Sequence, residues 1–198
     1  MATSIGHGLA GMALARVSGT PMTKANWRWY LFAVFAAGAP DLDFIPGLWA
    51  GAANRFHQMG SHSLCAAVAF GVLAGALLRI PNARSRDVGL WATMLYASHL
   101  LLDWLTLDTR APHGIPLLWP FSDRHFTAPF SVFLNIRHGT ENGGAADFFT
   151  ELLSLHNLGA VALEVLLLSP LLILADRRGK RRIRKAEVAS SRRVSARR

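Results

Sequence analysis

Residues 88–107, VGLWATMLYASHLLLDWLTL, decide the fold, because this stretch is apolar and helix-length and yet carries a histidine and an aspartate. His99 and Asp103 are four residues apart, so a helix places both side chains on one face. An aspartate in an apolar helix long enough to cross a bilayer is costly unless it is paired or bound to a cation. The stretch therefore predicts either a structural His–Asp hydrogen bond or a pair of metal ligands.

Four more apolar segments flank this one, at residues 5–17, 27–39, 62–80 and 158–175. A transmembrane helix needs about 20 residues, with some range. The segments 62–80, 88–107 and 158–175 meet that length, whereas 5–17 and 27–39, which stops at Pro40, are marginal and could be buried or partly inserted. These segments predict an all-α, polytopic membrane helical bundle of four to five apolar helices. A long loop at 108–157 on its polar side ends in a short helix at 145–155.

The positive charge is concentrated at the C-terminal end. Residues 176–198 contain eleven Lys or Arg and two Asp or Glu, so the rest of the chain is neutral. The basic tail directly follows an apolar run, which favours anionic lipids or a topology signal over nucleic acid, and it has no aromatic residues that could stack on bases. We expect a membrane-embedded domain at 1–175 and a disordered basic tail at 176–198.

Basic residues also predict the orientation of the bundle. Arg16, Lys24 and Arg28 surround the first link, and the link after residue 80 is also basic. Positive loops stay in the cytoplasm, so five crossings would place these links and the C-terminus there. The N-terminus, the stretch before residue 62 and the long loop would then share the other side. We expect a multi-pass membrane protein with a cytoplasmic C-terminus.

The PDLD motif at residues 40–43 carries two carboxylates, Asp41 and Asp43, between two prolines. The prolines favour a stiff extended or turn geometry. Neighbouring carboxylates repel each other and favour a shared cation. The alternative interpretation is a solvated loop or a helix cap.

Three histidines accompany these carboxylates. His57 and His62 lie in FHQMGSHSL, where Gly60 permits a sharp turn, and His7 lies in SIGHGLAG near the N-terminus. Imidazoles are common ligands for zinc and manganese, although a single histidine is usually not a ligand. Cys65 is the only cysteine, so neither a disulfide nor a thiolate metal site forms within one chain.

Together these residues predict a divalent-metal site with nitrogen and oxygen ligands. Zinc is the preferred ion, with manganese or iron as alternatives, and the number of carboxylates would suit two ions. Asp43 and Asp103 are the candidates for orienting water or acting as a base. The predicted metal ligands are His7, Asp41, Asp43, His57, His62, His99 and Asp103.

The order of these motifs resembles the YdjM type of bacterial inner-membrane metal-dependent hydrolases, a family described as LexA-binding and inner-membrane-associated. The matching strings, over residues 5–126, are IGHGLAG, GAPDLDFIPG, HQMGSHSL in place of HRGxTHS, SHLLLDWLT and GIPLLWPFS. The resemblance implies a helical, membrane-embedded protein with a hydrolytic metal centre, and it nominates the same seven residues. Gln58 stands where the family has a basic residue; Arg55 could substitute for it.

Three kinds of function follow. The first is a hydrolase that acts on an ester or phosphoester, either a small molecule or a lipid-linked substrate, with membrane lipids as partners. The second is a non-enzymatic protein that binds the ion for transport or structure. The third is a regulatory membrane protein whose basic tail binds a soluble partner. The loop GIPLLWPFS at 114–122 could shape the mouth of the site or be a Pro-ordered surface loop. Weaker ligand candidates in and beside the long loop are His113, Asp123, His125, His138 and His156.

Overall fold

The structure is a computed structural model that describes residues 1–17, 27–80, 83–140 and 143–195, with side chains described through residue 181. Within these residues the chain is helical or irregular; two isolated bridges, Thr106–Phe133 and Ile115–Phe126, are the only β-pairing described. The prediction of an all-α fold is confirmed. The helices are α1 (Ser4–Val17), α2 (Trp27–Gly38), η1 (Ala39–Asp43), α3 (Phe44–Trp49), η2 (Gly60–His62), α4 (Leu64–Leu77), α5 (Ser85–Trp104), α6 (Ala145–Leu152) and α7 (Leu155–Ser195).

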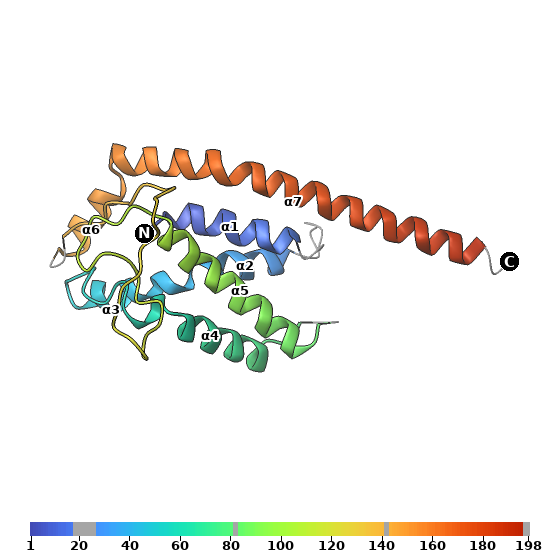
Figure 1. The fold of residues 1–198 in the computed structure, drawn as a ribbon, viewed down its shortest axis with the longest axis horizontal. Coiled ribbons are helices and arrows are strands. Elements are labelled where there is room, and N and C mark those ends of the chain that lie inside the picture. The colour runs from blue at the N-terminus through green and yellow to red at the C-terminus, as the bar shows by residue number, and fades with distance from the viewer. Residues whose placement is uncertain (18–26, 81–82, 141–142, 196–198) are drawn as a thin grey trace.

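The long helices form a bundle with two different ends. α1 packs against α7, α2 and α5, and α5 also packs against α2 and α4. The N-terminus, α3, α6 and the long loop lie together at one end, which we call the loop end (Figure 1). The link between α4 and α5 and the C-terminal half of α7 lie toward the other end, which we call the basic end. The predicted short helix at 145–155 is confirmed as α6.

α4 and α5 approach each other closely through glycines. A Cβ atom added to Gly71 would lie 2.6 Å from the Gly89 carbonyl oxygen, and one added to Gly75 would lie 2.7 Å from the Ser85 carbonyl oxygen. Any larger residue at either position would have to separate the two backbones. This contact fixes how α5, which carries His99 and Asp103, sits in the bundle.

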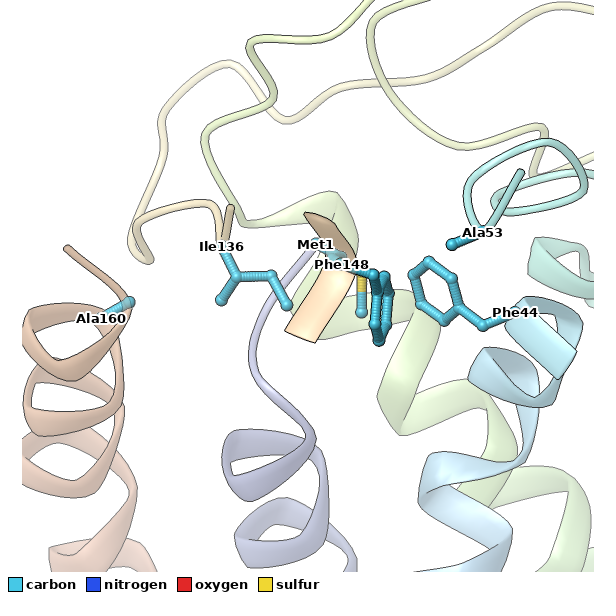
Figure 2. Packing of buried hydrophobic residues seen from close by; sticks show 6 residues of the cluster. All are labelled: Met1, Phe44, Ala53, Ile136, Phe148 and Ala160. Atoms are coloured by element: carbon cyan, nitrogen blue, oxygen red, sulfur yellow. The ribbon is translucent and has the colours of Figure 1, made fainter. Parts of the chain in front are cut away.

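A separate apolar cluster stabilises the loop end. Phe44, at the start of α3, and Phe148, in α6, have ring centroids 5.0 Å apart. The side chain of Met1 lies beside them (Figure 2), and its carbonyl oxygen accepts a hydrogen bond from the Ile136 amide. The cluster thus ties the N-terminus and the long loop to the helices. Its buried members are Met1, Phe44, Ala53, Ile136, Phe148 and Ala160.

The expected four to five membrane-length helices are not found. Within the described residues, two helical stretches are long and apolar enough to cross a membrane, residues 27–49 and 155–181. α4 has 14 residues, about 21 Å at 1.5 Å per residue, because residues 60–62 form a 3-10 turn and α4 ends at Leu77. α5 is long enough, but His99 and Asp103 at one end and charged residues at the other lower its hydropathy.

The second segment is longer than the sequence predicted. Pro40 does not end the helical path, because it stands in the first turn of η1, where no amide hydrogen is needed. The backbone continues through Asp43 into α3, so PDLD is helical rather than extended. At the other end of the chain, the α7 backbone stays helical to Ser195, where the sequence predicted a disordered tail. A domain boundary at residue 175 stays a prediction.

The outward faces of the helices are apolar. Leu31 on α2, Val72 on α4 and Leu166 on α7 are each more than half exposed, and α5 exposes Leu90 to a similar degree. Soluble monomers rarely expose apolar side chains on so many neighbouring elements. The side chains buried inside the bundle are smaller, with alanines at the contacts of α1 and α2.

Candidate metal centre

All seven residues predicted as metal ligands lie together at the loop end of the bundle. Four separate segments bring them there: the start of α1, the turn η1, the stretch 57–62 and the last turns of α5. The side chains of His7, His62, His99 and Asp103 are fully buried. The residues are His7, Asp41, Asp43, His57, His62, His99 and Asp103.

Asp103 is at the middle of this cluster. Its Oδ1 lies 3.3 Å from His7 Nε2, and its Oδ2 lies 3.4 Å from His62 Nε2 and 3.2 Å from His99 Nε2. The Nε2 atoms of His62 and His99 are themselves 3.2 Å apart. The predicted His99–Asp103 pair is therefore present, but it is part of a larger group in which three imidazoles face one carboxylate.

The other nitrogen of His99 fixes how this ring is protonated. His99 Nδ1 lies 2.8 Å from the carbonyl oxygen of Ala37. A carbonyl oxygen only accepts hydrogen bonds, so Nδ1 carries the proton and Nε2 of the neutral ring presents a lone pair to the cluster. The His7 ring stacks on the His99 ring with centroids 3.6 Å apart. Both the rotation and the tautomer of His99 are thus set by its neighbours, as is usual for a metal-ligating histidine.

Asp43 orients two histidines at once. Its Oδ1 lies 2.9 Å from His57 Nδ1, and its Oδ2 lies 3.3 Å from His62 Nδ1. The same Oδ2 accepts hydrogen bonds from the Ser61 hydroxyl at 2.6 Å and from the Gln58 amide at 3.1 Å. Both oxygens of Asp43 are occupied, and the Nε2 atoms of His57 and His62 are left for other partners. The Gln58 backbone has φ 57°, a left-handed conformation that points its amide at Asp43.

Several buried atoms in the cluster have no hydrogen-bond partner among the described residues. They are both carboxylate oxygens of Asp41, Oδ2 of Asp103, Nε2 of His57 and both ring nitrogens of His7. Asp41 Oδ1 lies 3.4 Å from His99 Nε2 and 3.7 Å from His62 Nε2. Buried carboxylate oxygens normally find donors, because an unpaired one is expensive. A cation among these atoms would remove that cost.

Three overlapping triads offer ligand atoms that lie within 4.8 Å of one another. Each triad combines imidazole nitrogen with carboxylate oxygen, which is the donor set that suits zinc, manganese or iron. Asp41 belongs to two of them, and Asp43 belongs to none. The triads are His7–Asp41–His99, Asp41–His57–His62 and His62–His99–Asp103.

His57, His62 and His138 differ in protonation. Burial lowers the pKa of His57, so its ring is neutral at physiological pH. Burial also opposes charge on His62, but the nearby carboxylates of Asp103, Asp41 and Asp43 outweigh it and raise the pKa of His62 well above 6.5. Burial, with the nearby His57, lowers the pKa of His138 to about 2. In the metal-free protein, His62 is therefore protonated beside the carboxylates.

The sequence did not predict the hydrogen bonds that the N-terminal residues make with Asp103 and with Glu164 of α7. The Ala2 amide donates to Asp103 Oδ1 at 2.8 Å, and the Thr3 amide donates to Glu164 Oε1 at 2.7 Å. The Thr3 hydroxyl makes a further bond to the same carboxylate. Glu164 is completely buried. As the one charged residue in its apolar segment, it gave a signal that could have been followed.

A cavity of about 560 Å³ adjoins the cluster. It lies between the stretch 54–60 and the long loop, and His57 belongs both to its wall and to the cluster. Gly114, Pro116 and Trp119 of GIPLLWPFS line it, so this loop shapes the mouth of the cavity. Gln58 and Arg55 line the same cavity, which places Arg55 near the position of the basic residue that the family has and this chain lacks.

The weaker candidates remain outside the cluster. His138 is the nearest, with its ring centroid 5.4 Å from that of His57 and its Nδ1 bonded to the Asn54 side chain. Asp123 and His125 line the cavity, and His156 bonds to the Asn135 carbonyl oxygen. None of the weaker candidates, His113 included, belongs to a triad among the described residues.

The fold and the site define an all-α protein with apolar outer faces and a buried histidine–aspartate cluster at one end of its helical bundle. The chain belongs to the YdjM inner membrane protein family, whose model matches residues 1–180. The resemblance drawn from the motifs is thereby confirmed, and with it the assignment to a family of membrane proteins. No curated protein and no solved structure matches the chain.

Proposed function

We propose that this protein is a membrane-bound, metal-dependent hydrolase that acts on an ester or phosphoester. The observation that carries the proposal is the set of buried, unpartnered atoms of Asp41, Asp103 and His57 inside a ring of histidines. These atoms could hold one or two divalent ions, with zinc preferred and manganese or iron as alternatives. A bound ion would polarise the substrate and lower the pKa of water.

The geometry supports different roles for the seven residues. Asp41, His62, His99 and Asp103 offer the ligand atoms nearest one another, with His7 beside them. Asp103 keeps the predicted catalytic role, because its unpartnered Oδ2 faces His62 and His99, where an ion would bind and a substrate would react. Asp43 is better described as a positioning residue, because both of its oxygens hold other side chains or backbone. His57 stands between the ion and the cavity, where its neutral ring could receive a proton.

The cavity favours hydrolysis over the alternative of an ion bound only for structure. A purely structural ion needs no access from outside, whereas His57 joins the cluster to a space of about 560 Å³. That volume lies within the range of small-molecule sites.

The membrane arrangement is part of the proposal. We infer that α1, α4 and α5 accompany the two longer helical stretches in the membrane, since α4 and α5 also turn leucine and valine outward. Basic residues at the basic end, among them Arg28, Arg84 and Arg178, would face the cytoplasm with the C-terminus. A reporter fused after Arg198 should read as cytoplasmic; a periplasmic reading would contradict this orientation.

The test of the hydrolase is turnover. Purified protein would be screened against soluble phosphoesters, carboxylic esters and short-chain phospholipids, before and after treatment with a chelator, and again after zinc, manganese or iron is restored. We expect turnover that the chelator abolishes and one metal restores. Asp41→Asn should be inactive, whereas Asp87→Asn, an aspartate at the basic end, should be active. If the metal-loaded protein turns over no substrate of these classes, the ion-binding alternative is favoured.

A further inference from the structure

The cavity beside the cluster carries its own chemistry. Its walls come from two stretches far apart in the sequence, 54–60 and 110–125. Trp119 joins them, because its ring packs directly on Gly60; a Cβ atom there would lie 2.8 Å from the ring. Gly60 immediately precedes Ser61 and His62, so the wall that contacts Trp119 continues into the cluster.

Two arginines, Arg55 and Arg110, line this cavity, one from each wall. Arg110 donates from Nη2 to the Gly139 carbonyl oxygen at 2.8 Å, which holds its position. Arg55 is exposed, and its guanidinium lies 5.6 Å from the centre of the Phe56 ring. Among the described residues, Asp123 is the one carboxylate that lines the cavity beside the two arginines. Arginine pairs match the oxygens of a phosphate better than those of a neutral ester.

The rim of the cavity is apolar. Trp119, which lines the cavity, is 44% exposed. Met59 lines the opposite wall and is more than half exposed. Such a rim gives an acyl or prenyl chain a surface on which to lie while a charged head group reaches the arginines.

We propose that this cavity binds a phosphate monoester or diester group, with its oxygens held by Arg55 and Arg110 next to His57. The proposal rests on the proposed function, since it names the substrate class of the same site. The shared chemistry is the phosphate group, and its source is either a lipid head group that uses Trp119 or a soluble phosphoester that does not.

The experiment measures binding by the full-length protein in an uncharged glycoside detergent, which contains no phosphate group. The probes are short-chain phosphatidic acid, inorganic phosphate and the uncharged short-chain diacylglycerol. Arg55→Gln and Arg110→Gln should each weaken phosphatidic acid binding about tenfold, as expected for loss of a charge-assisted contact. Arg84→Gln, an exposed arginine at the basic end, is the matched control and should bind as the wild type does. Diacylglycerol should bind at least tenfold more weakly than phosphatidic acid.

Trp119→Ala distinguishes the two sources. If it weakens phosphatidic acid binding and leaves inorganic phosphate unchanged, the site takes a lipid head group; if it changes neither, the site takes a soluble phosphoester. Unaltered phosphatidic acid binding in both arginine variants, or equal binding of diacylglycerol, would overturn the proposal. Metal content is measured in the same samples. Arginine variants that keep both metal and phosphate binding refute only this inference, whereas wild-type protein that holds no metal refutes the proposed function.

Discussion

The two ends of the bundle are built from the same helices and yet have opposite chemistry. At the loop end, α1, η1 and α5 bury histidines and aspartates within hydrogen-bond range of one another. At the basic end, charged side chains are either exposed, as for Arg86, whose side chain is 76% exposed, or paired with an opposite charge, as for Arg16 with Asp176. Buried polar groups are retained only where they have a partner or a task. The difference supports the proposal that the loop end is the functional end and that the basic end sets the orientation in the membrane.

The largest expected effect is the removal of a central ligand. Asp103→Ala and His99→Ala should each lose bound metal by a hundredfold or more in affinity, because each removes an atom that faces two other ligand atoms. The controls are Asp87→Ala on the same helix and His113→Ala in the long loop, which should retain wild-type metal content. Elemental analysis after gel filtration gives the answer. Full metal occupancy in both ligand variants would remove the contrast between the two ends.

A smaller loss is expected from Asp43→Asn. The amide of asparagine has one acceptor oxygen and no charge, so it cannot accept hydrogen bonds from both His57 and His62 as the carboxylate does. Loss of such an orienting partner typically costs 10- to 100-fold in metal affinity. Asp87→Asn is again the matched control. A competition titration with a zinc chelator measures the affinity. A loss as large as that of Asp103→Ala would instead indicate that Asp43 binds the ion directly, as the sequence alone predicted.

Metal affinity should also depend on pH. The pKa of His62 is raised in the metal-free protein by its three carboxylate contacts, so the ring is protonated at neutral pH and the ion must displace that proton. Affinity therefore rises with pH while the pH is below this pKa, by up to about tenfold per unit for one proton, and levels off above it. Titrations between about pH 6 and pH 8 test this. An affinity that is flat or falls over that interval would contradict the assignment of His62.

The hydrogen bonds between Thr3 and Glu164 give a prediction about stability. Thr3→Val removes a hydroxyl that bonds the buried Glu164 and leaves that carboxylate one donor short. We expect a loss of about 1–3 kcal/mol in the free energy of unfolding. Thr150→Val, at an exposed position of α6, should cost much less. Thermal unfolding in detergent compares the two variants. Equal melting temperatures would show that the hydrogen bond between Thr3 and Glu164 does not stabilise the fold.

The sequence was sufficient for the cluster and insufficient for its surroundings. Spacing on a helix, paired carboxylates and loop charge are local signals, and they brought His7, Asp41 and His62 into one predicted site. The Thr3–Glu164 contact joins residues that are 161 positions apart, and only the packing of α1 on α7 creates it. The helical path through Pro40 was missed for a different reason. Proline ends most helices but is tolerated in a first turn, and the sequence does not reveal where a new turn begins.

The smallest effect belongs to the basic end. Arg86→Gln breaks an exposed contact with Asp87, in which the charged atoms are 3.6 Å apart. Exposed ion pairs contribute little, so stability should change by less than about 0.5 kcal/mol and metal content should not change. Thermal unfolding and elemental analysis of the same preparation check both. A loss of metal in this variant would mean that metal binding at the loop end depends on the ion pair at the basic end.

The proposed function depends most on the presence of a metal ion among the buried histidines and aspartates. The most direct measurement is elemental analysis of the wild-type protein incubated with zinc and freed of unbound ions, together with its X-ray absorption spectrum. We predict at least one tightly held divalent ion per chain, with nitrogen and oxygen ligands and the scattering pattern of imidazole. A protein that holds no stoichiometric ion under these conditions, or one whose ion lacks imidazole ligands, would contradict the account.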